Sequence, residues 1–165
     1  MRVVVMGVAG CGKSSVGEAV AEALDATYLD GDDLHPAENI AKMSAGTPLT
    51  DDDRAPWLDE VGQKFAASAA PLLIGCSALK RHYRDRIRAA AGSDVCFLHL
   101  NGTRAVIEAR MSKRAGHFMP VSLLNSQFAD LELLQADESG VEIDIAAPFD
   151  TVVSKSIAAL RKDIS

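Results

Sequence analysis

The sequence lacks the features that would place it among secreted, metal-binding or membrane proteins. Cysteine occurs only three times in 165 residues, at Cys11, Cys76 and Cys96, and these positions are too far apart for a metal-binding motif. Scattered cysteines in odd number also give no disulfide framework, so we expect small buried thiols in a reducing compartment. No apolar run approaches the ~20 residues that cross a membrane, and no secretory signal precedes the first motif. The expected location is cytoplasmic.

Basic residues are in deficit as well. The chain has 17 lysines and arginines against 23 aspartates and glutamates, a formal net charge of −6. Such a chain lacks the general positive field that attracts nucleic acid irrespective of sequence. We therefore expect no nucleic-acid or membrane partner, although basic residues that converge locally could still bind a small anion. Because the sequence shows no linker, repeat or low-complexity stretch, residues 1–165 are predicted to form a single domain.

What the sequence does contain is a phosphate-binding motif near its start. The segment Gly7-Val8-Ala9-Gly10-Cys11-Gly12-Lys13-Ser14 fits Gly-x4-Gly-Lys-Ser/Thr, the P-loop, with an apolar strand before it and a helical pattern after it. Glycines let successive backbone N–H groups turn toward phosphate oxygens. Lys13 is predicted to reach the β- and γ-phosphates and Ser14 to hold Mg²⁺. The residues predicted to bind the nucleotide here are Gly7, Ala9, Gly10, Cys11, Gly12, Lys13, Ser14 and Ser15.

Strand and helix patterns alternate along the rest of the chain. Strands separated by helical stretches imply an α/β fold of three layers, a parallel sheet covered on both faces. The predicted strands are residues 3–6, 27–29, 71–76, 95–100 and 141–145. The predicted helices are residues 14–24, 36–44, 50–69, 80–91, 103–114 and 122–134, and a last helix that begins at Pro148.

Polar residues follow the predicted strands at the edge where ligands bind in such sheets. The second strand runs into Asp30-Gly31-Asp32-Asp33, with His35 three residues after Asp32. Asp32 has two interpretations. It could be a turn residue that bonds local backbone, or a catalytic carboxylate that orients a substrate hydroxyl, accepts its proton and helps place Mg²⁺ through water. Three carboxylates in four residues favour the catalytic role.

Two further regions carry cations. The third strand ends at Cys76-Ser77, and the helix after it presents Arg81, Arg84 and Arg88 on one side at i, i+3 and i+7. Such a cluster suits a bidentate grip on a carboxylate or phosphate, and a solvated helix face is the alternative. Later, the break at residues 114–118 is typical of a mobile lid that brings cations over phosphates, with an exposed loop as the alternative.

Together these stretches resemble the bacterial-type gluconate kinases (gluconokinases), a family of P-loop small-molecule kinases. The resemblance runs over nearly the full length, and its middle motifs are far more specific than the P-loop. These motifs are Leu29-Asp30-Gly31-Asp32, Asp51-Asp52-Asp53-Arg54-x-Pro56-Trp57, Cys76-Ser77-Ala78-Leu79-Lys80-x-His82-Tyr83-Arg84 and Arg114-x-Gly116-His117-Phe118, followed by Gln127-Phe128. The chain departs from the family at Ala9 and Cys11, where relatives often carry Ser, and a thiol at Cys11 suggests sensitivity to oxidation.

The resemblance implies transfer of a phosphoryl group from ATP, with Mg²⁺, to the 6-hydroxyl of D-gluconate, giving 6-phosphogluconate and ADP. It also implies the nucleoside monophosphate kinase fold, with a five-stranded parallel sheet, a lid at about residues 110–130, and a homodimer. The implied catalytic residues are Asp32, Lys13 and Arg114. The implied substrate contacts are Asp32 and His35 at the hydroxyl end, Arg54, Arg84 and Arg88 at the carboxylate, and Ser77, His117 and Gln127 around the pocket. Arg110, Arg114 and Pro148 are placed near the nucleotide.

Alternative functions stay open at this point. A shikimate kinase shares the P-loop, the paired aspartates and an arginine set, but the stretches at 51–57 and 76–80 favour gluconate. A nucleoside monophosphate kinase is less favoured, because the pocket motifs indicate a small polyol acid. A non-catalytic regulatory module that only binds a nucleotide is the alternative from another class. A GTPase would need Asn-Lys-x-Asp, and Asn101-Gly102-Thr103-Arg104 does not match it.

Overall fold

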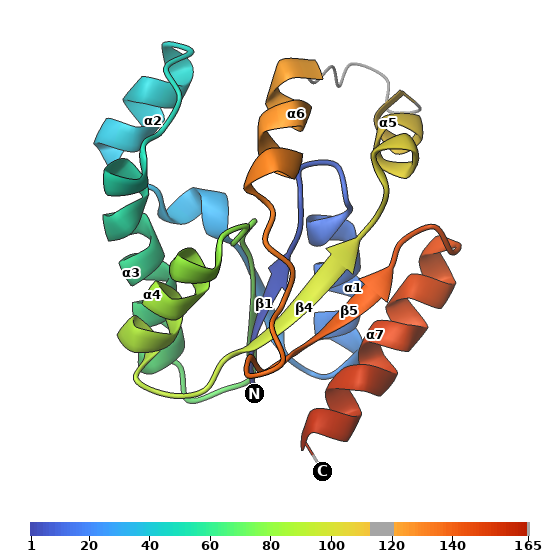
Figure 1. Ribbon diagram of the computed structural model, residues 1–165. Helices are drawn as coiled ribbons and strands as arrows, with labels where there is room; N and C mark the ends of the chain where they lie inside the picture. The colour runs from blue at the N-terminus through green and yellow to red at the C-terminus, as the bar shows by residue number, and fades with distance from the viewer. Residues whose placement is uncertain (113–120, 165) are drawn as a thin grey trace.

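A computed structural model describes residues 1–112 and 121–164 of the chain. Within these ranges, five parallel strands form one sheet in the order β2-β3-β1-β4-β5 (Figure 1), which confirms the predicted fold class. The register places Val3 beside Leu73 of β3 and Cys96 of β4, so β1 lies at the centre of the sheet. The strands are β1 (Arg2–Met6), β2 (Thr27–Asp30), β3 (Leu72–Gly75), β4 (Cys96–Asn101) and β5 (Gly140–Asp144).

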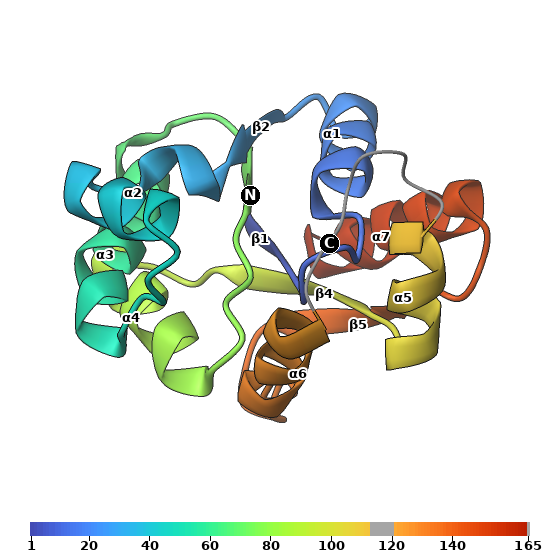
Figure 2. The same ribbon diagram turned by 90° about the horizontal axis from the view of Figure 1, so that it is seen from above.

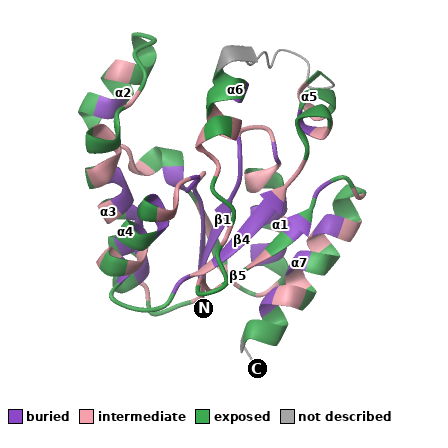
Figure 3. Ribbon diagram, viewed as in Figure 1, coloured by how far each residue is buried: buried purple, intermediate pink, exposed green. Residues whose placement is uncertain are grey.

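Helices cover both faces of the sheet because successive strand residues point to opposite sides and both sides are apolar. In β1, Val3 and Val5 pack toward α1 (Lys13–Ala23) and α7 (Phe149–Ile164). Val4 and Met6 pack toward α3 (Asp51–Ala67) and α4 (Arg81–Ala91). Figures 1 and 2 show these pairs as the two outer layers, and Figure 3 shows β1 and β4 buried between them.

The remaining short elements lie at the carboxyl edge of the sheet, the upper end in Figure 1. They are the 3₁₀ helix η1 (Gly31–Leu34), α2 (Ala37–Ser44), α5 (Arg104–Ser112) and α6 (Val121–Asp130). Arg114 and His117, two of the predicted site residues, lie outside the described residues. No helix in the described part of the chain is long and apolar enough to span a membrane.

Local sequence explains where several helices begin and end. Thr50 and Asp53 form a reciprocal capping box at the start of α3, with Asp53 N donating to Thr50 Oγ1 at 3.1 Å and Thr50 N to Asp53 Oδ2 at 2.9 Å. The prediction of a helix through residue 134 was wrong, because α6 ends at Asp130. The chain beyond is not helical, and its backbone bonds to another part of the fold: Glu132 N donates to Leu79 O at 2.7 Å.

Candidate active site

The P-loop links β1 to the N-terminus of α1. Gly10 and Gly12 adopt φ values of +83° and +95°, a region that favours glycine, and so turn the loop back on itself. Inside the loop, Lys13 Nζ donates to Gly7 O at 2.9 Å and Val8 O at 3.2 Å. Gly12 is the N-cap of α1 and has no side chain to bond the first N–H groups of the helix. These N–H groups, the helix N-terminus and the ammonium fit a polyphosphate.

The P-loop contains the two positions, Ala9 and Cys11, at which the chain departs from the family pattern. Cys11 is fully buried, and its burial raises the pKa of the thiol although Lys13 opposes this. The thiolate is the form that oxidants attack, and burial favours the protonated thiol, so the oxidation sensitivity of Cys11 stays a prediction that peroxide treatment would test. Cys76 is buried too, which agrees with the expectation of small buried thiols, whereas Cys96 is only partly covered. Ala9 contributes its backbone N–H, which donates to Gln127 Oε1 at 2.6 Å.

Arg110 lies beside the P-loop, as predicted. Its guanidinium is 3.7 Å from the point where a Cβ on Gly12 would stand, and it donates to Ile145 O. The contact with Ile145 ties the last turn of α5 to the end of β5. Pro148 begins the turn into α7 and accepts a hydrogen bond from Val152 N at 3.0 Å. Its position beside an adenine remains a prediction.

A polar cavity of about 140 Å³ opens between the P-loop and the ends of β2 and β3. It brings together five residues that the sequence predicted for the site and four others. The predicted ones are Ala9, Lys13, Asp32, Ser77 and Gln127, and the others are Tyr28, Asp30, Gly75 and Cys76. A larger hollow of about 280 Å³ lies at the opposite edge of the sheet, around Arg2 and Asp94, and contains none of the predicted site residues.

Tyr28 is the clearest residue that sequence reasoning missed. Its ring packs against Gly17 and Gly75, where an added Cβ would lie within 2.4 Å and 2.0 Å of ring or hydroxyl atoms. Burial raises the pKa of Tyr28 to about 12, although the side chain of Ser14, the predicted Mg²⁺ ligand, opposes this rise. The signal that could have found it is the strand period, since Tyr28 lies two residues before Asp30 and shares its side of β2.

The structure separates the two roles that the sequence left open for the aspartates after β2. Asp30 takes the turn role: its Oδ1 accepts from Asp32 N at 2.9 Å and caps η1. The Asp32 side chain is therefore not used by the turn and lines the cavity. Although Asp32 keeps contact with solvent, partial burial and then the charge of Asp30 raise the pKa of its carboxyl group. A raised pKa makes a carboxylate a better proton acceptor.

Behind Asp32, an aromatic pair fixes the second predicted substrate residue. Trp57 donates from Nε1 to Gly31 O at 2.7 Å, and the His35 ring stacks on Trp57 with centroids 4.1 Å apart. Asn39 Nδ2 lies 3.2 Å from His35 Nδ1, an arrangement that assigns the imidazole proton to Nε2. Burial lowers the pKa of His35, so the ring is a neutral donor.

Arg54 extends this wall from the first turns of α3. Its Nη1 donates to Leu49 O at 2.9 Å, and its guanidinium lies 5.7 Å from the centroid of the Tyr83 ring. The Lys80 ammonium lies 5.5 Å from the same ring. Asp51, which accepts a hydrogen bond from Tyr83, is 3.8 Å from Arg54 and 3.6 Å from Lys80. Two cations therefore converge here on one carboxylate, and Lys80 is a cation that the sequence did not single out.

Arg84 does not join the cavity, and its predicted role as a carboxylate ligand is corrected here. Arg84 is fully buried, with Nε and Nη2 donating to the two oxygens of Glu138 at 2.8 and 3.1 Å. Its remaining donors go to the carbonyl oxygens of Ala78, Leu79 and Leu133 at 2.9 to 3.3 Å. All five guanidinium donors are thus used within the protein, and none is left for a substrate.

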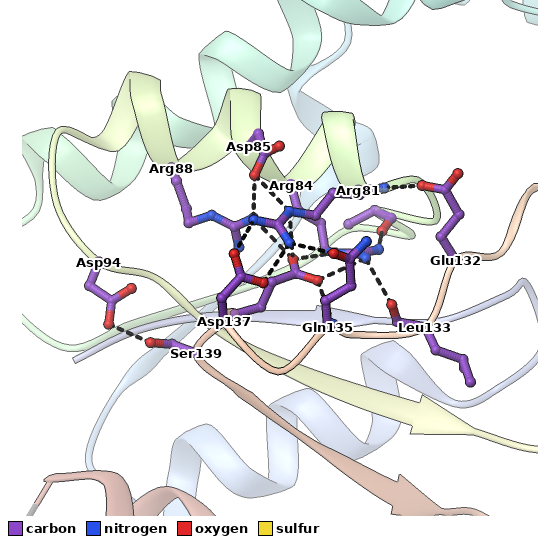
Figure 4. A network of polar contacts seen from close by, with 12 residues as sticks. Arg81, Arg84, Asp85, Arg88, Asp94, Glu132, Leu133, Gln135, Asp137 and Ser139 are labelled. Atoms are coloured by element: carbon purple, nitrogen blue, oxygen red, sulfur yellow. Dashed lines mark hydrogen bonds and ion pairs between the residues drawn. The ribbon is translucent and has the colours of Figure 1, made fainter.

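Arg88 and Arg81 belong to the same network, which Figure 4 shows between α4 and the chain after α6. Arg88 Nη2 bonds Asp85 at 2.6 Å and Glu138 at 3.0 Å, whereas its Nη1 is buried without a hydrogen-bond partner among the described residues. Arg88 does not line the cavity, and its predicted role at the substrate carboxylate stays a prediction. Arg81 binds Asp85 at 3.0 Å and Asp137 at 2.8 Å. The helical spacing correctly predicted one shared side for the three arginines. It could not show that acids from residues 137 and 138 would fill that side.

Gln127, in the last turn of α6, reaches the P-loop from the other side of the cavity. Its Oε1 accepts a hydrogen bond from Ala9 N at 2.6 Å. The residues that the structure brings to one place are therefore the P-loop with Arg110, then Asp32, Ser77 and Gln127 at the cavity, and His35 behind Asp32.

A P-loop after the first strand of a parallel sheet, with a polar cavity beyond it, defines a P-loop phosphate-binding domain. In agreement, the sequence matches the AAA domain family over residues 3–134. It is 50% identical over 168 residues to the thermosensitive gluconokinase of Escherichia coli K12, covering 97% of this chain and 89% of that protein. The crystal structure of a gluconokinase from Sinorhizobium meliloti 1021 superposes with a TM-score of 0.90 at 49% identity, covering 98% of this chain and 91% of the other.

The chain belongs to the gluconokinase family. A shikimate kinase from Aquifex aeolicus, with a TM-score of 0.62 at 13% identity over 99% of this chain and 98% of its own, shares the fold alone. The family resemblance read from the middle motifs is thus confirmed, and the shikimate kinase alternative is not favoured.

Proposed function

We propose that this protein is a gluconokinase that transfers the γ-phosphoryl group of ATP to the 6-hydroxyl of D-gluconate, giving 6-phosphogluconate and ADP. The observation that carries this proposal is the shared cavity: the Asp32 carboxylate and the P-loop residues Ala9 and Lys13 line the same 140 Å³ of polar space. In a regulatory module that only binds a nucleotide, Asp32 could help place Mg²⁺ through water but would have no substrate hydroxyl to orient.

The P-loop side of the cavity binds the nucleotide. The N–H groups of Gly10 and residues 12–15 and the Lys13 ammonium hold the phosphates, Ala9 borders them with its N–H on Gln127, and Arg110 lies beside the loop. Ser14 is the proposed Mg²⁺ ligand, with Asp32 as a further ligand through water. Bound Mg²⁺ supplies charge neutralisation at the phosphate oxygens. Arg114 and Pro148 are proposed to complete the nucleotide site, Arg114 from a lid over about residues 110–130.

On the acceptor side, Asp32 orients the hydroxyl and then removes its proton. The 6-hydroxyl oxygen forms a bond to the γ-phosphorus, while the bond from that phosphorus to the bridging oxygen breaks and leaves its electron pair on ADP. The hydroxyl proton passes to the Asp32 carboxylate. His35, with its proton on Nε2, donates a hydrogen bond to the sugar acid beside Asp32, and Ser77 and His117 border the pocket.

The carboxylate of gluconate is assigned to the cations beside Tyr83. Arg84 is taken up by Glu138 and Arg88 is tied to the same network through Nη2, so Arg54 is the predicted ligand nearest His35, and Lys80 adds a second charge over the same Tyr83 ring. A carboxylate bound there would take over contacts that Asp51 makes in this structure. This assignment keeps the carboxylate and the reacting hydroxyl at opposite ends of a short open-chain substrate.

The protein is further proposed to be a cytoplasmic homodimer without nucleic-acid or membrane partners. The acidic charge and the family resemblance support this proposal. Sedimentation of the purified protein at micromolar concentration would give a dimer mass, and a monomer mass at every concentration would contradict it.

ADP release from Mg-ATP, measured across D-gluconate, other aldonic acids, shikimate and nucleoside monophosphates, tests the activity. Saturable turnover with D-gluconate, with 6-phosphogluconate as the product, is the expected outcome. Turnover only with shikimate or with a nucleotide would support phosphoryl transfer but contradict D-gluconate as the acceptor. ATP binding without any turnover would instead support the regulatory module.

A further inference from the structure

The contact between Gln127 and Ala9 fixes the orientation of an amide at the cavity. A backbone N–H can only donate, so the Gln127 atom 2.6 Å from Ala9 N is the carbonyl oxygen Oε1. The amide nitrogen Nε2 is then the end of the side chain that remains for the cavity, which Gln127 lines. A glutamine held in this way presents two N–H donors beside the loop that binds phosphates.

The position of Gln127 is supported from the C-terminal side of α6. Five residues further along, Glu132 N donates to Leu79 O at 2.7 Å, and Glu132 Oε1 accepts from Arg81 N at 2.6 Å. Leu133 O accepts from the buried Arg84 at 3.3 Å. The chain that leaves α6 is thus tied to the start of α4 and to the loop after β3, which carries Ser77.

The groups around the cavity differ in what they can offer a phosphoryl group. Asp32 is an acceptor and repels the oxygens of the γ-phosphate, whereas Lys13 and the P-loop N–H groups are donors on one side only. Gln127 approaches Ala9 from α6, so it adds neutral donors on another side. Charge spreads over three oxygens in the transition state, and donors on several sides stabilise it best.

We propose that Gln127 is a catalytic residue that donates from Nε2 to an oxygen of the transferred phosphoryl group while its Oε1 stays on Ala9 N–H. The proposal rests on the proposed function for the identity of that group. It differs from two simpler roles. In one, Gln127 only holds the shape of the loop. In the other, it occupies the Ala9 N–H until a phosphate displaces it.

Two substitutions separate these roles. Gln127→Glu keeps an oxygen for Ala9 N–H but replaces the donors with a second acceptor, and Gln127→Leu removes both functions at similar volume. Gln63→Glu, the same change on the exposed surface of α3, is the matched control. Work at about pH 8 keeps the introduced carboxylates ionised. Titration calorimetry with Mg-ADP and with a non-hydrolysable Mg-ATP analogue gives two affinities without turnover. Their difference measures the contribution of the γ-phosphate to binding.

We expect affinity for the ATP analogue to be highest in the wild type, lower in Gln127→Leu and lowest in Gln127→Glu. Loss of a hydrogen bond to a charged group should lower the affinity of Gln127→Leu for the ATP analogue about 10-fold or more. Its affinity for ADP should change little, because ADP lacks the γ-phosphate. Gln127→Glu should weaken the analogue further and lower kcat by roughly 100-fold or more, because a donor becomes a repelling charge. The KM for gluconate should move far less than kcat.

Two outcomes would overturn the proposal. If Gln127→Glu behaves like wild type and only Gln127→Leu is impaired, Gln127 merely anchors the loop. If Gln127→Leu binds the analogue more tightly than wild type does, then a phosphate must displace Gln127 Oε1 from the Ala9 N–H when the nucleotide binds. Failure of the wild type to phosphorylate gluconate would reject the proposed function, whereas the comparison of analogue with ADP would still report on Gln127.

Discussion

Two charged regions of the molecule, the cavity beside the P-loop and the arginine side of α4, differ in whether their charges are already matched. In the cavity beside the P-loop, the Asp32 side chain makes no hydrogen bond within the described part of the chain, since Asp30 caps the turn. On α4, by contrast, every guanidinium N–H of Arg84 donates a hydrogen bond within the protein, to Glu138 or to one of three carbonyl oxygens. Both regions had the residue types of a ligand site in the sequence.

The difference shows that charge type and spacing do not by themselves indicate a ligand. A group that is free to bind a substrate has hydrogen-bonding capacity that the fold leaves unused, as at Asp32. A group with all its capacity used stabilises the fold, as at Arg84. Mutations in the first region should therefore change kinetics with little effect on stability, and those in the second should do the reverse.

The largest effect is expected from Asp32→Asn. Asparagine keeps the shape but cannot take the hydroxyl proton, so kcat should fall by roughly 10²–10⁴, with ATP affinity and Tm nearly unchanged. Steady-state kinetics with gluconate and calorimetry with ATP measure the two parts. Asp33→Asn, one residue along on the exposed side of η1, is the control and should keep full activity. A fully active Asp32→Asn enzyme would refute the catalytic assignment.

Glu138→Gln should have the largest effect on stability. The side chains of Arg84 and Glu138 are both fully buried, and removing one charge of such a pair leaves the other uncompensated. We expect the free energy of unfolding to fall by on the order of 3 kcal/mol in urea titrations. The double change Arg84→Met with Glu138→Leu should recover part of this loss, because the buried Arg84 charge is removed together with its partner, while Arg88 still loses its contact with Glu138. A raised KM for gluconate at unchanged stability would instead place the pair at the substrate.

The pH dependence of stability gives an independent check on the same pair. Burial alone would raise the pKa of Glu138, but hydrogen bonds from Arg84, Gln135 N–H and Arg88 bring it down from 4.5 to about 2. A folded-state pKa below the unfolded value stabilises the protein above about pH 4.5, and this contribution is lost as pH falls toward about 2. The difference in stability between wild type and Glu138→Gln should therefore shrink over that window.

Local signals in the sequence predicted most of the fold. The P-loop, the capping box at Thr50 and the strand and helix alternation each depend on neighbouring residues, and the elements they predicted are present. The end of α6 was predicted wrongly because its cause is distant. The backbone at residues 132 and 133 bonds to Leu79 and Arg84, some 50 positions earlier. No periodicity in residues 122–134 carries that information.

The same limit applies to the site. Asp32, Ser77 and Gln127 were predicted by strand ends and family motifs, and they do share a cavity. The fate of Arg84 depended on Glu138, whose pairing cannot be read from helical spacing. Tyr28 and Lys80 were missed for a related reason: each is placed by packing, Tyr28 against Gly17 and Gly75 and Lys80 over Tyr83.

Arg54→Ala tests whether the cations beside Tyr83 take over the role once given to Arg84. Loss of one charge-assisted contact to the substrate carboxylate should raise the KM for gluconate roughly 10- to 100-fold, with KM for ATP little changed. Arg86→Ala is the control, since Arg86 pairs with Asp59 on the exposed side of α4. An equal rise in the KM for ATP would indicate that Arg54 contacts the phosphates instead. An unchanged KM for gluconate would show that Arg54 does not bind the substrate.

The smallest effect is expected from Asp137→Asn, at the exposed rim of the arginine network. Arg81 binds Asp137 through two hydrogen bonds of 2.8 and 3.1 Å, but the Asp137 side chain is 71% exposed. Solvent and salt screen such a pair, so Tm should stay within about 2 °C of wild type and kcat should not change. Glu138 and Asp137 are adjacent in sequence and both bind arginines of α4, so burial is the variable that distinguishes them. Should Asp137→Asn destabilise the protein as much as Glu138→Gln does, the network would act as one unit, and the comparison between its buried centre and its rim would fail.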